Sequence, residues 1–254
     1  METRKQYIYL SLQIMNYTLH KILVIGILFL SSLDVLAQNS DIMPDRSAES
    51  RTGAELRYYP TRNLKLSIEQ QLRFDDNISV FDKTYTEINA RYRFWNQLDL
   101  GIGYRYIFLN DNHGQEQGIE KYYRIHYYIS HQFEFNRFEM KNRIKFQNRK
   151  EILDNSIDCL EEIRNCWRVK SSLNYNIKRC KFDPFLSAEI FLPTNQWENK
   201  LHNRYRLSIG ADIKLSKKQK ISVEYMFDHE IKSWNPEIFH IIQINYIFSI
   251  KRKS

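Results

Sequence analysis

The side chains of this 254-residue chain that could do chemistry are its 7 histidines, its 3 cysteines and its many charged residues. No two histidines have the H-x3-H spacing of a metal site. Ser130 and His131 are neighbours and Ser208 lies in a strand-like segment, but a triad is defined by a geometry that a sequence does not give. The chain has no glycine-rich phosphate loop. We therefore expect no catalytic residues, no metal and no cofactor.

One enzymatic alternative stays open, a barrel that acts on lipid. A lipase or deacylase of this kind needs a histidine and a serine at one rim, close to the bilayer. His131 and His240 lie at the strand positions that this alternative requires. A histidine near a membrane interface is more often without a catalytic role, so we expect that the protein is not an enzyme.

Two of the cysteines could form a disulfide. Cys159 and Cys166 lie in or beside one predicted loop, and export would permit a bond between them. Cys180 falls in a short turn, which should lie at the opposite rim, so it is expected to stay unpaired. Free thiols throughout are an equal alternative.

These residues are carried by segments in which apolar and polar side chains alternate. In LKLSIEQQLRF (64–74) the even positions are apolar except for Gln70, and the odd positions are polar. This pattern predicts a β-strand with two unlike faces. It recurs in segments near 51–58, 63–74, 84–95, 98–109, 121–133, 138–149, 162–177, 184–192, 203–215, 220–228 and 238–249. Most are longer than the ~5–6 residues of soluble strands and suit tilted membrane strands of ~9–11 residues.

Apart from Lys121 at the first position of its segment, the apolar face of these segments contains no Asp, Glu, Lys or Arg. Its other exceptions are uncharged or histidine: Gln70, Thr86, His131, Asn142, Ser171 and His240. Lipid would impose this exclusion, because a Lys or Arg at the bilayer midplane costs ~2–4 kcal/mol. So many large apolar groups would not fit inside a small barrel, so we expect them outside. Aromatic residues near strand ends, among them Tyr122 and Phe191, are expected to form interfacial girdles.

The connections between the segments alternate in length. Short ones fall at 59–62, 95–97, 133–137, 178–183 and 216–220, and long ones at 75–83, 110–120, 150–161, 193–202 and 229–237. This alternation is typical of an up-and-down barrel with turns at one rim and loops at the other. Single-chain outer-membrane barrels of bacteria have even strand counts. We therefore expect twelve strands, with residues 39–50 supplying the extra one, or ten.

The polar face would line the barrel lumen. Its candidate lining residues are Arg73, Arg91, Arg93, Arg105, Arg124, Arg143, Glu189, Arg204, Arg206 and Glu224. Two interpretations compete. Arginines and carboxylates could pair across strands and fill the lumen, or a partly open lumen with excess arginine could favour anionic solutes.

The N-terminal residues are typical of an export signal. Lys21 precedes the apolar run 22–30, and VLA (35–37) offers a cleavage site. We expect a signal peptide at 1–37, an N-terminal segment or first strand at 38–50, a barrel at 51–250 and a basic tail at 251–254. The alternative is an uncleaved anchor, and Met15 is an alternative start.

Several stretches resemble a family of uncharacterised outer-membrane β-barrel proteins of Bacteroidota, defined as a domain of unknown function. The matching stretches are IEQQLRFDD (68–76), LGIGYRYIF (100–108), NRIKFQNR (142–149), DPFLSAEIF (183–191), NRYRLSIGADIKL (203–215), VEYMF (223–227) and IIQINYIF (241–248). The resemblance implies a signal peptide followed by a barrel, and it brings no catalytic residues.

Together these observations predict an all-β, up-and-down antiparallel transmembrane barrel in the outer membrane of a Gram-negative cell. The expected partners are membrane lipid, lipopolysaccharide and the outer-membrane assembly machinery. The net charge of +8 does not indicate nucleic acid, because the basic residues alternate with apolar ones along the chain. The expected function is porin-like, a narrow pore for small anionic solutes, or else purely structural. A lipid-modifying barrel enzyme and a soluble secreted β-protein are the alternatives, and the oligomeric state stays open.

Overall fold

The computed structural model describes residues 45–111, 118–152, 164–194, 203–231 and 236–252. The predicted signal peptide lies outside these residues. Every regular element within the described residues is a β-strand: β1 (Asp45–Tyr59), β2 (Leu64–Asp75), β3 (Val80–Trp95), β4 (Leu98–Asp111), β5 (Gly118–Phe135), β6 (Phe138–Glu151), β7 (Arg164–Tyr175), β8 (Phe182–Pro193), β9 (Asn203–Lys214), β10 (Gln219–Ile231) and β11 (Glu237–Lys251). Each of the eleven segments read from the alternation corresponds to one of them.

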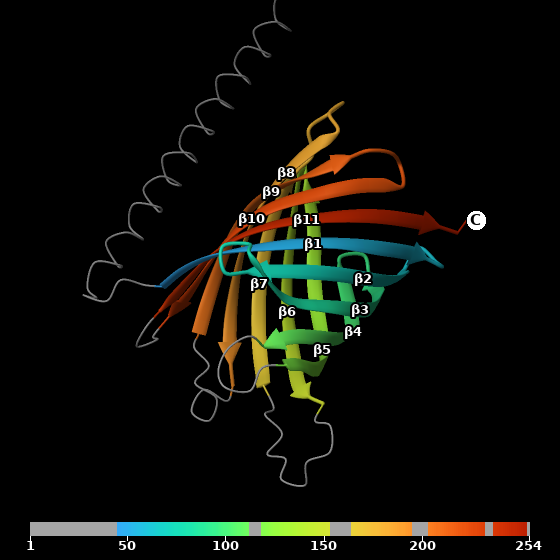
Figure 1. The fold of residues 1–254 in the computed structure, drawn as a ribbon. Coiled ribbons are helices and arrows are strands. Elements are labelled where there is room, and N and C mark those ends of the chain that lie inside the picture. Colours follow the sequence, from blue (N-terminus) through green and yellow to red (C-terminus); the bar gives the residue numbers. More distant parts are fainter. Residues whose placement is uncertain (1–44, 112–117, 153–163, 195–202, 232–235, 253–254) are drawn as a thin grey trace, which may run out of the picture. The chain divides into compact units, whose positions relative to one another are not determined.

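The strands form one closed barrel (Figure 1). Each strand pairs antiparallel with the next one along the chain, and β1 pairs with β11 in parallel to close the sheet. The parallel pair follows from the odd number of strands, because the first and last strands of an up-and-down meander then run in the same direction. The all-β barrel is confirmed, and its eleven strands lie within the predicted range of ten to twelve.

The first strand starts earlier than its sequence pattern indicated. Residues 45–50, which we considered for a separate twelfth strand, instead extend β1. Its partner along their full length is β11, from Asp45 opposite Glu237 to Tyr59 opposite Lys251. The starts of β1 and β11 therefore lie side by side at one rim, and their ends lie side by side at the other.

The short connections fall together at the rim where β1 and β11 end. They join strands through residues 60–63, 96–97, 136–137, 176–181 and 215–218. One predicted long loop, 75–83, is wrong: β2 and β3 are separated only by residues 76–79. Three successive residues of this turn have positive φ, Asp76 at 49°, Asn77 at 55° and Ile78 at 70°. A left-handed run of this kind reverses the chain within few residues.

The two faces of the sheet differ as the alternation predicts. Large apolar side chains cover the outside, and Ile88 and Ile209 are each 58% exposed there. The opposite parity points inward, where the carboxylate of Asp99 has no exposed surface and His126 keeps 1%. Polar exceptions on the outer face bond to one another: Gln70 Nε2 donates to Thr84 Oγ1 at 2.7 Å. The apolar face is therefore the outer face.

The inner face also holds aromatic residues. Tyr122 and Phe191 are each 5% exposed inside the barrel, so their assignment to an interfacial girdle is wrong. Both occupy positions that alternate with the apolar face and therefore point inward. The girdle assignment relied on their place near strand ends and not on this parity. No helix in the described part of the chain is long and apolar enough to cross a membrane.

Candidate functional site

Four carboxylates inside the barrel each hold two basic side chains. The groups are Asp99 with Arg91 and Arg93, Glu189 with Arg143 and Arg168, Asp228 with Arg204 and Arg206, and Glu55 with Arg57 and Lys65. Asp99, for example, lies 2.9 Å from Arg91 and 2.8 Å from Arg93. Eight basic side chains thus share four carboxylates, and each group keeps one uncompensated positive charge.

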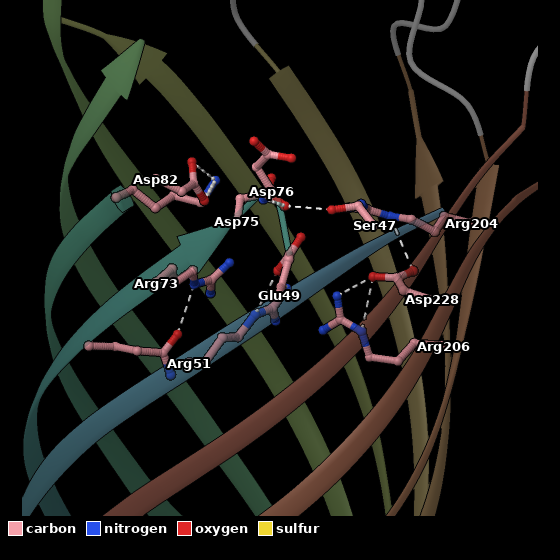
Figure 2. Close-up of polar contacts among 12 residues, drawn as sticks. Ser47, Glu49, Arg51, Arg73, Asp75, Asp76, Asp82, Arg204, Arg206 and Asp228 are labelled. Carbon is pink, nitrogen blue, oxygen red and sulfur yellow. Dashed lines mark hydrogen bonds and ion pairs between the residues drawn. The ribbon is translucent and has the colours of Figure 1, made fainter. Parts of the chain in front are cut away.

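Figure 2 shows the part of this interior that lies near the start of β1. Ser47 Oγ donates to Asp75 Oδ1 at 2.8 Å, which ties β1 to the end of β2. Arg51 donates to Glu49 at 2.7 Å on its own strand. Arg73 donates to the side-chain amide of Gln71 at 2.8 Å rather than to a carboxylate. Basic side chains from several strands therefore face one enclosed space.

The register of the sheet brings basic residues into two rows across neighbouring strands. One row runs over β1, β2 and β3 through Arg51, Arg73 and Lys83. The other runs over β4, β5 and β6 through Arg105, Arg124 and Arg149. Like charges directly opposite each other on paired strands are destabilising. Stability alone would therefore not favour two such rows.

Several guanidinium groups in the lumen make cation–π contacts with aromatic rings. Arg105 lies over the ring of Tyr85 at 3.6 Å, and Arg149 lies over the ring of Tyr122 at 3.8 Å. Arg168 lies over the ring of Phe191 at 4.4 Å. A cation over an aromatic face gains roughly 0.5–2 kcal/mol. These rings hold the guanidinium groups in place without neutralising their charge.

The lumen is filled with side chains at several levels. Gln71, Ser130, Asp228 and His126 are almost wholly buried, and Ile241 adds an apolar group with no exposed surface. His126 Nε2 lies 3.2 Å from Asn89 Nδ2 and 3.9 Å from Glu87. A barrel of about eight strands has an interior that side chains just fill, and porins with sixteen leave a wide channel. Eleven strands with these contacts give a narrow lumen.

The candidate lumen residues lie as follows. Arg91, Arg93, Arg105, Arg143, Glu189, Arg204 and Arg206 take part in the ion pairs above or in the Arg105–Glu87 pair at 2.6 Å. Arg73 and Arg124 lie in the two rows. Glu224 has one buried oxygen, Oε1, without a hydrogen-bond partner.

The remaining candidates make the following contacts. Cys166 is a free thiol whose Sγ donates to the Trp167 carbonyl at 3.3 Å, and its proposed disulfide partner Cys159 lies outside the described residues. Cys180 is free and exposed. His131 contacts Gln97 at 3.1 Å and His240 contacts the hydroxyl of Tyr225 at 2.7 Å. In the described part of the chain, no three His, Cys, Asp or Glu side chains gather as they would around a metal ion.

Sequence reasoning missed some lumen residues that matter here. Arg51 and Arg149 lie at the ends of their predicted segments, and Tyr85 and Tyr122 were not expected inside. The signal that could have found them is parity alone, because all four share the polar parity of their strands.

Comparison with known proteins assigns the chain to a family. Residues 52–236 match the family described as protein of unknown function (DUF2490), and the chain belongs to it. No protein with a curated description matches significantly.

Several solved structures have a similar fold. The NanC porin is 12% identical, with 80% of this chain and 99% of that chain covered and a TM-score of 0.48. The β-domain of the Bordetella autotransporter BrkA is 10% identical, with 76% and 86% covered and a TM-score of 0.47. OmpT of Vibrio cholerae, lacking loop L8, is 8% identical, with 69% and 59% covered and a TM-score of 0.36. At these values nothing about activity transfers to this chain.

Proposed function

We propose that this protein is an outer-membrane β-barrel whose narrow lumen admits small anions. The observation that carries the proposal is the shared carboxylates: each of four holds two basic side chains, so the interior stays positive even where its acids are paired. Rings of basic side chains favour anions over cations.

The outer surface supports the membrane location. Its exposed side chains are predominantly large and apolar, and they belong to all eleven strands. A soluble protein seldom exposes one contiguous apolar patch of more than a few hundred Å². Lipid removes this surface from water, whereas a soluble secreted barrel would leave it exposed.

A second candidate function, a purely structural barrel, is favoured by the packed interior of the lumen. Asp99 and Ile241 have no exposed surface, and His126 is nearly as buried. If these contacts are permanent, no solute passes. The two candidates differ in one measurable property, which is conductance.

The test has two stages. The full chain should fractionate with outer membranes and show heat-modifiable migration on gels, and recovery in a soluble periplasmic fraction would refute the membrane location. The purified barrel should then give step conductance in planar bilayers, with steps well below those of a general porin. A barrel without steps would support the structural alternative, and activity on phospholipid or lipopolysaccharide without steps would support the lipid-acting one.

A further inference from the structure

We propose that Arg124, together with Arg105 and Arg149, forms a binding site inside the barrel for a multivalent oxyanion of the phosphate class. The inference deepens the proposed function and rests on it only in placing an anion in the lumen. Binding can be measured whether or not the anion passes through.

The three arginines are direct neighbours across three strands. Arg105 on β4 is paired with Arg124 on β5, and Arg124 is paired with Arg149 on β6. Paired strands lie ~4.8 Å apart, so the outer two backbones are ~10 Å apart with Arg124 between them. All three side chains have the inward parity. One small anion can therefore meet more than one guanidinium group.

The central arginine has no counter-charge among the described residues. Arg124 makes no hydrogen bond or ion pair with any described residue, and its Nε is buried without a partner. The charged side chains that act on it most strongly are Arg105, Arg149, Arg168 and Arg73, and all four are cations. A half-buried cation that faces other cations and has no counter-charge is repelled by its neighbours. A bound anion would offset that repulsion.

The flanking arginines are held by their surroundings. Arg105 pairs with Glu87 at 2.6 Å and lies on the ring of Tyr85. The hydroxyl of Tyr85 donates in turn to Glu69 at 2.9 Å.

On the other side, the ring beneath Arg149 is fixed as well. This ring belongs to Tyr122, and the Tyr122 hydroxyl donates to Glu120 at 2.6 Å. Tyr85 and Tyr122 belong to one buried cluster with Ile107, so both rings have fixed positions. A site whose side chains are already ordered loses less entropy when it binds a ligand.

The chemistry of the three side chains selects the ligand class. A guanidinium group presents its N–H donors in a planar fork that matches two oxygens of a phosphate or carboxylate. A phosphate has more acceptor oxygens and a higher charge than an acetate, so it can engage neighbouring forks at once. Chloride is a single monovalent atom, so it makes fewer contacts with neighbouring forks and brings less charge than phosphate. The expected order of affinity is phosphate, then acetate, then chloride.

The experiment uses the full-length purified barrel in detergent and follows thermal unfolding by heat-modifiable migration. Inorganic phosphate is titrated at constant ionic strength, with sodium chloride and sodium acetate as parallel series. Phosphate should raise the midpoint temperature in a saturable manner. Arg124→Gln should weaken this response at least tenfold. The matched control Arg62→Gln, which removes one positive charge from an exposed turn, should leave the response intact.

A second readout is the unfolding temperature without phosphate, which reports how far the unpaired charge of Arg124 destabilises the barrel. In chloride alone, Arg124→Gln should unfold at a higher temperature than the wild-type protein, because it removes a repelled charge. If Arg124→Gln does not fold, Arg124→Lys keeps the charge but loses the fork and should also bind phosphate more weakly. An equal phosphate response in the wild-type protein and in the folded variant, or no saturable response in the wild-type protein, would overturn the site.

The two proposals fail in different ways. Phosphate stabilisation without step conductance keeps the site and refutes passage. Anion-selective conductance without phosphate stabilisation keeps passage and refutes the site.

Discussion

The ring of Tyr128 on β5 occupies the space that a side chain on Gly101 of β4 would need. The two residues are directly paired, and a Cβ built at Gly101 would overlap the phenol ring. The hydroxyl of Tyr128 donates to Asn89 Oδ1 at 3.1 Å, which fixes the ring in this place. Gly103 and His126 repeat the arrangement one level along the same pair of strands. Glycine here lets large rings fold across the inner wall.

Gly101→Ala should therefore destabilise the barrel by roughly 1–3 kcal/mol, because the added methyl group overpacks the Tyr128 ring. Urea unfolding of the purified barrel measures the loss. A double variant with Tyr128→Ala should lose less than the sum of the two single variants. Gly118→Ala is the control, since no atom lies within 4 Å of its added Cβ. Equal losses at Gly101 and Gly118 would contradict this explanation.

Asp99→Asn should cost about 3–5 kcal/mol of unfolding free energy, because it leaves two arginines without their shared counter-charge. The substitution keeps the shape of the side chain, so the loss reports charge rather than packing. Asp76→Asn is the matched control: Asp76 is exposed in the β2–β3 turn, and asparagine tolerates its positive φ of 49°. Similar stability of both variants would show that the Asp99 group contributes little.

Ile88→Arg should destabilise the barrel by ~2–4 kcal/mol when unfolding is measured in phospholipid vesicles, because it places a charge on the lipid face. Ile88 is 58% exposed on the outer wall. Leu215→Arg changes an exposed residue in the turn after β9, where a charge near the interface should cost ~0–1 kcal/mol. If the two variants lose the same stability, the outer wall does not face lipid.

Arg204→Gln should lower the ratio of anion to cation permeability with little change in stability. Arg204 lies 3.6 Å from Asp228, and Arg206 also holds that carboxylate, so the variant leaves a neutral pair. The Arg204 side chain is 36% exposed, and pairs that solvent screens contribute little to stability. Reversal potentials of the variant, the wild-type protein and the exposed-turn control Arg137→Gln measure the change. An unchanged permeability ratio would show that Arg204 and its Asp228 group do not determine the selectivity.

Much of the fold could be predicted because alternation has a simple physical cause. Lipid excludes charge from one face, so residues such as Ile88 and Arg91 reveal their sides by parity alone. The start of β1 was harder to find. Its outward positions include Ser50 and Thr52, which do not continue the apolar pattern, and its pairing with β11 is needed to see the strand.

The two rows of basic residues could not be predicted, because the sequence of a single strand does not specify its register with the neighbouring strands. Arg105, Arg124 and Arg149 are far apart in the sequence, and only the pairing of β4, β5 and β6 aligns them. A shift of register by two residues would keep every side chain on its face and still break the row. The turn at 76–79 was missed for a related reason, since its polar residues resemble those of a longer loop.

The most direct test of the central claim is the reversal potential of the wild-type barrel in a planar bilayer across a potassium chloride gradient. A positive lumen predicts a reversal potential of the sign expected when chloride is the more permeant ion. The potential should be larger at low salt, because salt screens the basic side chains. A potential of the sign set by potassium, or one near zero at every salt concentration, would contradict an anion-selective lumen.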